Sequence, residues 1–162
     1  MTMAGRSVIL TLAGLFLLAG GSTPQARQAK DPRPIEEAVL TANAEMERAA
    51  EAVDAERLFT FVLDTDKGSV IQNGVFLATR EEALRRVTNN LRGISKIEYR
   101  WKRQHVTVLS ADVALLTAEG ESIVTATEGQ AFTTPLAQTV VFVMRDGHWK
   151  ALHAHQSSPQ VR

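Results

Sequence analysis

The spacing of apolar residues changes near Gly93 from a helical period to a lasting period of two, and that change constrains the fold more than any other feature. Before it, apolar residues recur at three- and four-residue steps, as on one face of an α-helix. After it, apolar and polar residues alternate with a period of two, which is typical of β-strands. Helices followed by strands predict an α+β domain, in which N-terminal helices pack on an antiparallel sheet.

Three helices are predicted in the first part of the domain. Asp54 is placed to cap a short second helix that carries Leu58, Phe59 and Val62. Thr79 and Glu82 form a capping box ahead of a third helix over 80–91, and Gly93 stands where a C-terminal cap belongs. The first and longest helix has an apolar stripe made of Ile35, Ala38, Val39, Ala42, Met46, Ala49 and Val53.

The strands predict a curved sheet. Two short strands over 69–78 bend at Asn73-Gly74, and four longer strands cover 94–109, 113–127, 132–145 and 148–157. Asp146-Gly147 is expected to form a tight hairpin turn between the last two strands. Short connections without helices between the longer strands imply an antiparallel meander. Tyr99 and Trp101 share one face, whereas Val106 falls on the other, so a β-bulge around residues 103–105 is expected to restore one face and bend the sheet.

The N-terminus predicts export. Arg6 precedes an uncharged apolar stretch, VILTLAGLFLLAG, and small residues follow it, which is the layout of a secretory signal peptide. We expect residues 1–21 to be removed before Ser22, with Ala26 as a weaker site and an uncleaved anchor as the alternative. Residues 22–34 are then a polar linker, and 35–160 form the domain. The protein is expected in the periplasm or outside the cell, with no membrane attachment after cleavage.

Composition narrows the possible partners and chemistry. The chain has no cysteine, so disulfides, thiolate catalysis and thiolate-bound metals are excluded. Removing Arg6 leaves 17 of the 18 Lys and Arg residues against 18 Asp and Glu, a formal charge of −1. A near-neutral chain gives no basis for nucleic-acid binding.

Two histidines near the C-terminus are the first candidates for chemistry. Strand alternation predicts that Trp149, Ala151, His153 and His155 project on one side of the last strand. A zinc site needs a third ligand, and nothing fixes one, so no metal site is predicted. Acid/base use of His153 or His155 stays open because histidine titrates near neutral pH, beside a plain structural role.

The chain resembles SnoaL-like domains of the nuclear transport factor 2-like superfamily over about residues 35–158. The resemblance rests on the order of elements, on the A-x-D-A-E-x-L-F ending of the first helix, and on the closing strand GHWKALHAHQS. It implies a cone-shaped α+β barrel, an apolar pocket between sheet and helices, and frequent homodimers. It implies no single activity, and the stretch from Val70 to Gly74 lacks the aspartate base of the isomerase-like branch.

The leading hypothesis is an exported domain that binds a small, mostly apolar molecule and needs no cofactor. The residues expected to line the pocket are Tyr99, Trp101, Trp149, His153 and His155. One alternative is an enzyme of isomerase, cyclase, dehydratase or hydrolase type, with His155 or His153 as acid or base and Tyr99 as a hydrogen-bond donor. The other is a dimeric assembly module whose pocket is plugged by its own side chains.

Overall fold

The computed structural model describes residues 31–67 and 69–158, which form three helices and six strands. The helices are α1 (Arg33–Glu51), α2 (Ala55–Phe59) and α3 (Arg80–Asn90), and the strands are β1 (Val70–Gln72), β2 (Val75–Leu77), β3 (Ile94–Val108), β4 (Val113–Ala126), β5 (Ala131–Arg145) and β6 (His148–Ser157). The predicted signal peptide, and the predicted linker as far as residue 30, lie outside the described residues. Within those residues, no helix is both long and apolar enough to cross a membrane.

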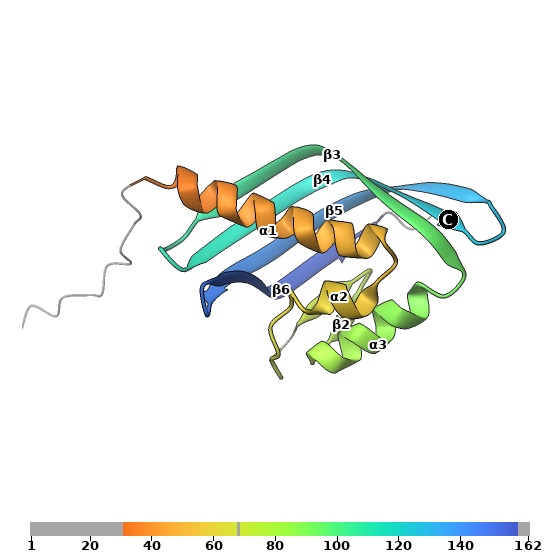
Figure 1. Cartoon of the computed structure of the whole chain (residues 1–162), viewed down its shortest axis with the longest axis horizontal. Coiled ribbons are helices and arrows are strands. Elements are labelled where there is room, and N and C mark those ends of the chain that lie inside the picture. The colour runs from red at the N-terminus through yellow and green to blue at the C-terminus, as the bar shows by residue number, and fades with distance from the viewer. Residues whose placement is uncertain (1–30, 68, 159–162) are drawn as a thin grey trace, which may run out of the picture.

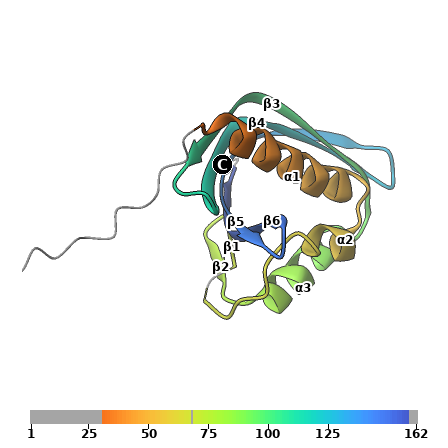
Figure 2. The same cartoon turned by 60° about the vertical axis from the view of Figure 1, so that its left-hand side comes forward.

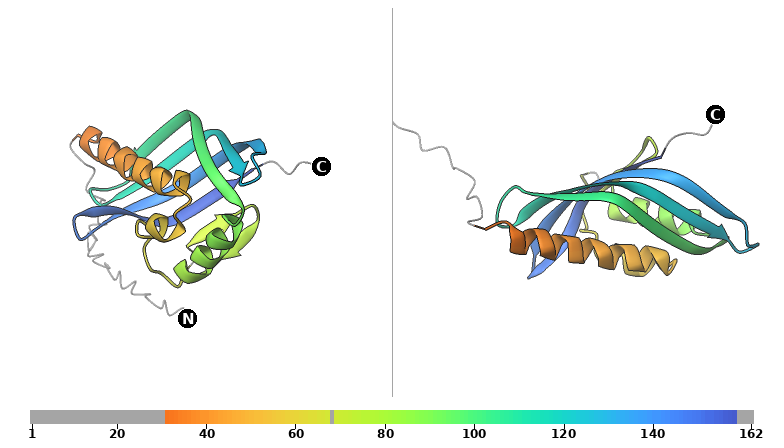
Figure 3. Two further views of the ribbon diagram at one scale, coloured as in Figure 1. Left: turned by 45° about the vertical axis from the view of Figure 1, so that its right-hand side comes forward. Right: turned by 90° about the horizontal axis from the view of Figure 1, so that it is seen from above.

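All six strands belong to one open, curved sheet in the order β2-β1-β6-β5-β4-β3. The four long strands form the predicted antiparallel meander, and β1 pairs with β6 in the parallel direction. The sheet bends around α1, which lies along its concave side near β3 and β4 (Figures 1 and 2). Seen edge-on, α1 follows the concave side, while α2 and α3 lie near β1 and β2 (Figure 3). The predicted α+β class is confirmed.

The predicted helix caps are present. Asp54 accepts a hydrogen bond of 2.9 Å from the backbone N–H of Arg57 and so caps α2. Thr79 and Glu82 form both hydrogen bonds of the capping box at the start of α3. Helix α1 begins at Arg33 and has Pro34 in its first turn, where a residue without an N–H leaves no intrahelical hydrogen bond unmade.

Two hairpins turn where the sequence predicts. Asn73 and Gly74 have φ angles of 49° and 81°, and Asp146 and Gly147 have 51° and 78°. A two-residue turn with both φ angles positive matches the right-handed twist of its strands, and Asn-Gly and Asp-Gly adopt it readily. The second turn fixes the register of β5 against β6 at the Asp146 end.

A β-bulge in β3 brings the two halves of that strand to one face. Trp101 lies opposite Gly120 and Arg103 lies opposite Glu119, so Lys102 is the additional residue. The bulge was predicted one residue later, at 103–105. With it, Val106 packs against the core on the same concave side as Trp101.

A second bulge, in β6, contradicts the predicted common face of Trp149, Ala151, His153 and His155. Ala151 pairs with Phe142 and His153 pairs with Val141, which leaves Leu152 without a partner residue in β5. One additional residue inverts the alternation beyond it. The inward residues after the bulge are therefore Ala154 and Gln156, and His153 and His155 take the outer face.

The bulge coincides with a change of neighbour along β6. Before it, Ala151 exchanges hydrogen bonds of 2.8 and 2.9 Å with Phe61 and Leu63 in the segment after α2. After it, the strand pairs with β1, and Ala154 donates to the carbonyl of Ser69. Periodicity cannot reveal this change, because it depends on segments distant in sequence.

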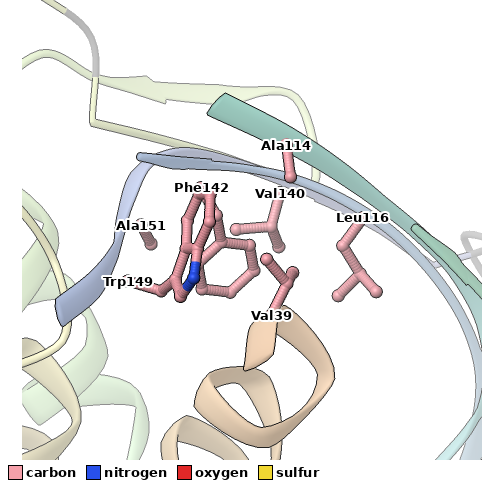
Figure 4. Close-up of a cluster of buried hydrophobic side chains, with 7 residues drawn as sticks. All are labelled: Val39, Ala114, Leu116, Val140, Phe142, Trp149 and Ala151. Atoms are coloured by element: carbon pink, nitrogen blue, oxygen red, sulfur yellow. The ribbon is translucent and has the colours of Figure 1, made fainter. Parts of the chain in front are cut away.

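The main core lies between the concave side of the sheet and α1. Figure 4 shows Val39 of α1 reaching toward Leu116 of β4 and Phe142 of β5, with the Trp149 indole of β6 beside Phe142. Trp149 is 8% exposed, and Phe142 is fully buried. This cluster occupies one end of the concave side, and the other end holds the cavity described below.

Candidate functional site

A cavity of about 520 Å³ lies between the concave side of the sheet, α1 and α3. Ligand pockets commonly have volumes of about 300–1,000 Å³. The side chains of the described residues leave this space unfilled, in contrast to the plugged pocket of the assembly alternative. The residues that line it are Asn43, Met46, Glu47, Ala50, Leu58, Gln72, Asn73, Val87, Asn90, Leu91, Ile94, Ile97, Tyr99, Trp101, Ser122, Val124, Thr134, Leu136, Gln138, Val140, Ala154, Gln156 and Ser158.

The lining is mainly apolar, with uncharged polar groups and one carboxylate. None of the described residues that line the cavity is a lysine, an arginine or a histidine. Glu47 is the one acidic side chain among the described residues that line the cavity. The described part of the lining therefore offers no cationic side chain to an anionic ligand.

Glu47 stands at the α1 side of the cavity and receives two hydrogen bonds on the same oxygen. The indole Nε1 of Trp101 donates to Oε1 at 2.7 Å, and the amide Nδ2 of Asn43 donates to it at 2.5 Å. Burial raises the pKa of Glu47, while these two hydrogen bonds oppose the shift. The second carboxylate oxygen, Oε2, has no hydrogen-bond partner among the described residues.

Tyr99 lies beside Trp101 on β3, and the two rings are stacked. Their planes differ by 3° and their centroids are 5.7 Å apart. Burial raises the pKa of Tyr99 to about 12, and the charges of Glu47 and Glu51 add to the shift. The hydroxyl is therefore a neutral donor, and within the described part of the chain it has no hydrogen-bond partner.

Four amide side chains form a hydrogen-bonded row on the opposite side of the cavity. Asn90 of α3 donates to Gln72 of β1 at 3.3 Å, Gln72 donates to Gln156 of β6 at 3.1 Å, and Gln156 donates to Gln138 of β5 at 3.2 Å. All four residues line the cavity. The row joins α3 to the sheet and offers a polar surface without charge.

The structure brings together two of the five predicted site residues. Tyr99 and Trp101 line the cavity, as a ligand-binding role requires. Trp149 belongs to the core cluster and is not a lining residue. His153 and His155 lie on the outer face of β6, because the bulge at Leu152 inverts the alternation that had placed them inside. Their roles as acid, base or ligand contact stay predictions.

The polar residues of the cavity were not predicted from the sequence, although the sequence holds a partial signal. Asn43 sits beside the apolar stripe of α1 and is only 3% exposed, so it needs a buried partner. Glu47 lies four residues later, on the same side of the helix. Gln138 alternates with Leu136 and Val140 on β5, which marks it as an inward polar residue. Gln156 could not be found without the bulge.

The described residues contain no group of three His, Asp or Glu side chains arranged to hold a metal ion. Two glutamates of β4 form ion pairs with arginines of β3. Glu119 pairs with Arg103 at 2.8 Å, and Glu121 lies 3.9 Å from Arg100. The four side chains of these ion pairs are solvent-accessible, and none of them lines the cavity.

Residues 39–160 match a family model described as a SnoaL-like domain. No curated protein matches the sequence. Among solved structures, a proposed dehydratase of the NTF2-like family from Streptomyces avermitilis is similar with a TM-score of 0.70 and 24% identity, covering 81% of this chain and 100% of that one. An NTF2-like superfamily protein from Salmonella enterica has a TM-score of 0.71 and 12% identity, with coverages of 81% and 95%. A proposed aromatic ring hydroxylase from Novosphingobium aromaticivorans has a TM-score of 0.70 and 15% identity, with coverages of 82% and 94%. At these identities the likeness to solved structures concerns the fold.

Proposed function

We propose that this protein, which belongs to the SnoaL-like domain family, binds one small, mostly apolar molecule in the cavity between α1, α3 and the sheet. The observation that carries the proposal is the unfilled space of about 520 Å³ with a mainly apolar lining. An apolar molecule that enters such a space leaves water, which is favourable in proportion to the apolar area buried.

The polar groups of the cavity support a ligand with a few hydrogen-bonding atoms. The Tyr99 hydroxyl and Glu47 Oε2 both belong to lining residues and have no partner among the described residues. A buried phenol ordinarily finds a hydrogen-bond partner. A ligand that supplied one would satisfy groups that the chain itself leaves open.

An uncharged fluorescent probe, N-phenyl-1-naphthylamine, tests the proposal. We expect saturable binding of one molecule per chain, with a rise in probe fluorescence as it enters an apolar site. Val124 and Thr125 are adjacent on β4, and only Val124 lines the cavity. Val124→Trp is expected to abolish probe binding by filling the cavity, and Thr125→Trp, on the opposite face, to preserve it. Equal binding by both folded variants would contradict the proposal.

A catalytic function at the same cavity is the second candidate, and Glu47 is the observation that favours it. A carboxyl group whose pKa is raised by burial, and which faces a cavity, is suited to exchange a proton with a bound molecule. Two of the similar structures also carry enzyme names. Turnover of an identified substrate by Glu47→Gln, compared with the native protein, distinguishes catalysis from binding alone.

Export and self-association are further parts of the proposal. Export rests on the n-region, apolar stretch and small residues of the N-terminus. A homodimer rests on the family resemblance, and the molar mass from light scattering after size-exclusion chromatography measures it.

A further inference from the structure

Among the described residues that line the cavity there is one carboxylate and no cationic side chain. Glu47 is a carboxylate at its wall, and within the described ranges no cationic side chain lies at ion-pair distance from it. Arg48, the next residue, forms an ion pair with Glu45, in which Nη2 of Arg48 lies 3.6 Å from Oε1 of Glu45. The Arg48 side chain is largely exposed. By contrast, the carboxylates Glu98, Glu119 and Glu121 on the outer face each have an arginine or lysine partner. Glu47 is the acidic side chain that the fold leaves facing a cavity without a counter-ion.

The two partners of Glu47 hold it in place without neutralising it. Trp101 and Asn43 are uncharged donors, and both use Oε1. Oε2 is left for a third donor, and the cavity is where such a donor would come from. An ammonium group fits this position, because it has three N–H donors and a charge opposite to that of the carboxylate.

The aromatic wall adjoining Glu47 suits the same group. Tyr99 and Trp101 lie parallel on β3, and Trp101 donates directly to Glu47. The faces of aromatic rings attract cations, most strongly when the cation is removed from water. A carboxylate beside aromatic rings, in a cavity whose described lining residues include no cation, favours a positive ligand and disfavours a negative one.

The other lining residues indicate the chemical character of the part of the ligand that does not carry the charge. The apolar lining includes Met46, Leu91, Ile97, Val124 and Leu136. The far side carries the uncharged amide row that ends at Gln138. A second charged group on the ligand would meet no opposite charge there.

We propose that the cavity selects an apolar molecule carrying a single amine, whose ammonium group binds Glu47 Oε2 against the Tyr99 and Trp101 wall. This inference rests on the proposed function, since it names the class of molecule that the cavity takes. It assigns Glu47 as the residue that determines specificity for the cation, and Trp101 as the residue that orients Glu47.

Three probes of one shape and different charge test the inference: 2-naphthylmethylamine, 2-naphthylmethanol and 2-naphthoate. Isothermal titration calorimetry at neutral pH gives the affinity of each for the full domain. We expect the amine to bind about tenfold more tightly than the alcohol, and the carboxylate to bind most weakly. In Glu47→Gln, the amine and the alcohol are expected to bind with similar affinity, with the affinity for the alcohol retained.

Glu51→Gln is the matched control. Glu51 lies one helical turn after Glu47, accepts the backbone N–H of Tyr99 at 3.2 Å, and does not line the cavity. This variant is expected to keep the preference for the amine. Equal binding of amine and alcohol by the native protein overturns the inference, and so does loss of the preference in Glu51→Gln but not in Glu47→Gln. Failure of all three probes to bind overturns the proposed function, and the inference with it.

Discussion

Trp101 donates its indole N–H to Glu47 at 2.7 Å, and this hydrogen bond joins the edge strand β3 to α1. Both side chains line the cavity. The bulge at Lys102 and the close packing at Gly120 fix where Trp101 lies on its strand. The position of the carboxylate in the cavity therefore depends on the geometry of the sheet.

Glu47→Gln is expected to remove one component of the pH dependence of stability. Burial raises the pKa of Glu47 in the folded state above its ordinary value of about 4.3. Its contribution to stability is therefore complete below that value and is lost as pH rises through the folded-state pKa. Relative to the native protein, Glu47→Gln should be more stable at neutral pH, and the difference should shrink toward pH 4. Chemical denaturation across that pH range measures it. A difference that does not vary with pH would contradict the assignment.

Gly120→Ala is expected to disturb β3 at the site. A Cβ at Gly120 would meet the carbonyl oxygen of Arg100 and come within 2.8 Å of the Trp101 Cα, so the two strands must move apart. Overpacking of this kind costs about 1–3 kcal/mol. The variant should also bind N-phenyl-1-naphthylamine more weakly, since Trp101 is displaced. Ser122→Ala, on the same face of β4, is the control and should change stability little. Unchanged stability and binding in Gly120→Ala would refute the close approach.

Local sequence patterns were sufficient to predict the helices, strands and turns. The features that were not predicted depend on pairings between segments distant in sequence. The cap at Asp54, the capping box of Thr79 and Glu82, and the Asp146-Gly147 turn depend on neighbouring residues, and each forms as predicted. The bulge at Leu152 lies where β6 stops pairing with the segment after α2 and begins pairing with β1. No local sequence pattern indicates this change of pairing partner.

The missed bulge explains why His153 and His155 lie on the outer face of β6. Strict alternation placed His153 and His155 inward, whereas the inward residues are Ala154 and Gln156. Tyr99 and Trp101 were correctly expected on the concave side, because they precede the bulge of their own strand. Glu47 was overlooked since a charged residue on a helix is usually solvated, and only its partners on β3 and α1 reveal otherwise.

The N-terminal sequence predicts that the mature protein lacks its first 21 residues. An n-region with Arg6, an apolar stretch and small residues before Ser22 are the layout of a cleavable secretory signal peptide. Intact-mass measurement of protein from the extracytoplasmic fraction should give a mass reduced by the residues that precede Ser22. A soluble cytoplasmic protein that keeps its first methionine and the apolar stretch would exclude this prediction.

Glutamine substitutions at His153 and His155 test the predicted acid/base role. Loss of a general base lowers turnover by about 10²- to 10⁴-fold. Because neither histidine lines the cavity, we expect both variants to bind the uncharged probe as the native protein does. Their effects should appear in the melting temperature. A large loss of turnover on an identified substrate, with the melting temperature unchanged, would establish catalysis on the outer face of β6.

Trp149→Ala is expected to destabilise the domain far more than Trp101→Ala does. Trp149 packs in the core cluster with Val39, Phe142 and Ala151, and truncating a buried tryptophan costs about 3–5 kcal/mol. That is a large share of the total stability of an ordinary domain, about 5–15 kcal/mol. Trp101 faces an existing cavity, so its removal costs mainly the hydrogen bond to Glu47, about 1–3 kcal/mol.

Equilibrium denaturation of the two alanine variants measures both costs, and titration with the uncharged probe supplies the second readout. Trp149→Phe is the milder variant if Trp149→Ala does not fold, and it should keep probe binding because Trp149 is absent from the cavity lining. Trp101→Phe should keep most of the stability while losing the N–H that orients Glu47. A cost below about 1 kcal/mol for Trp149→Ala would contradict its place in the core.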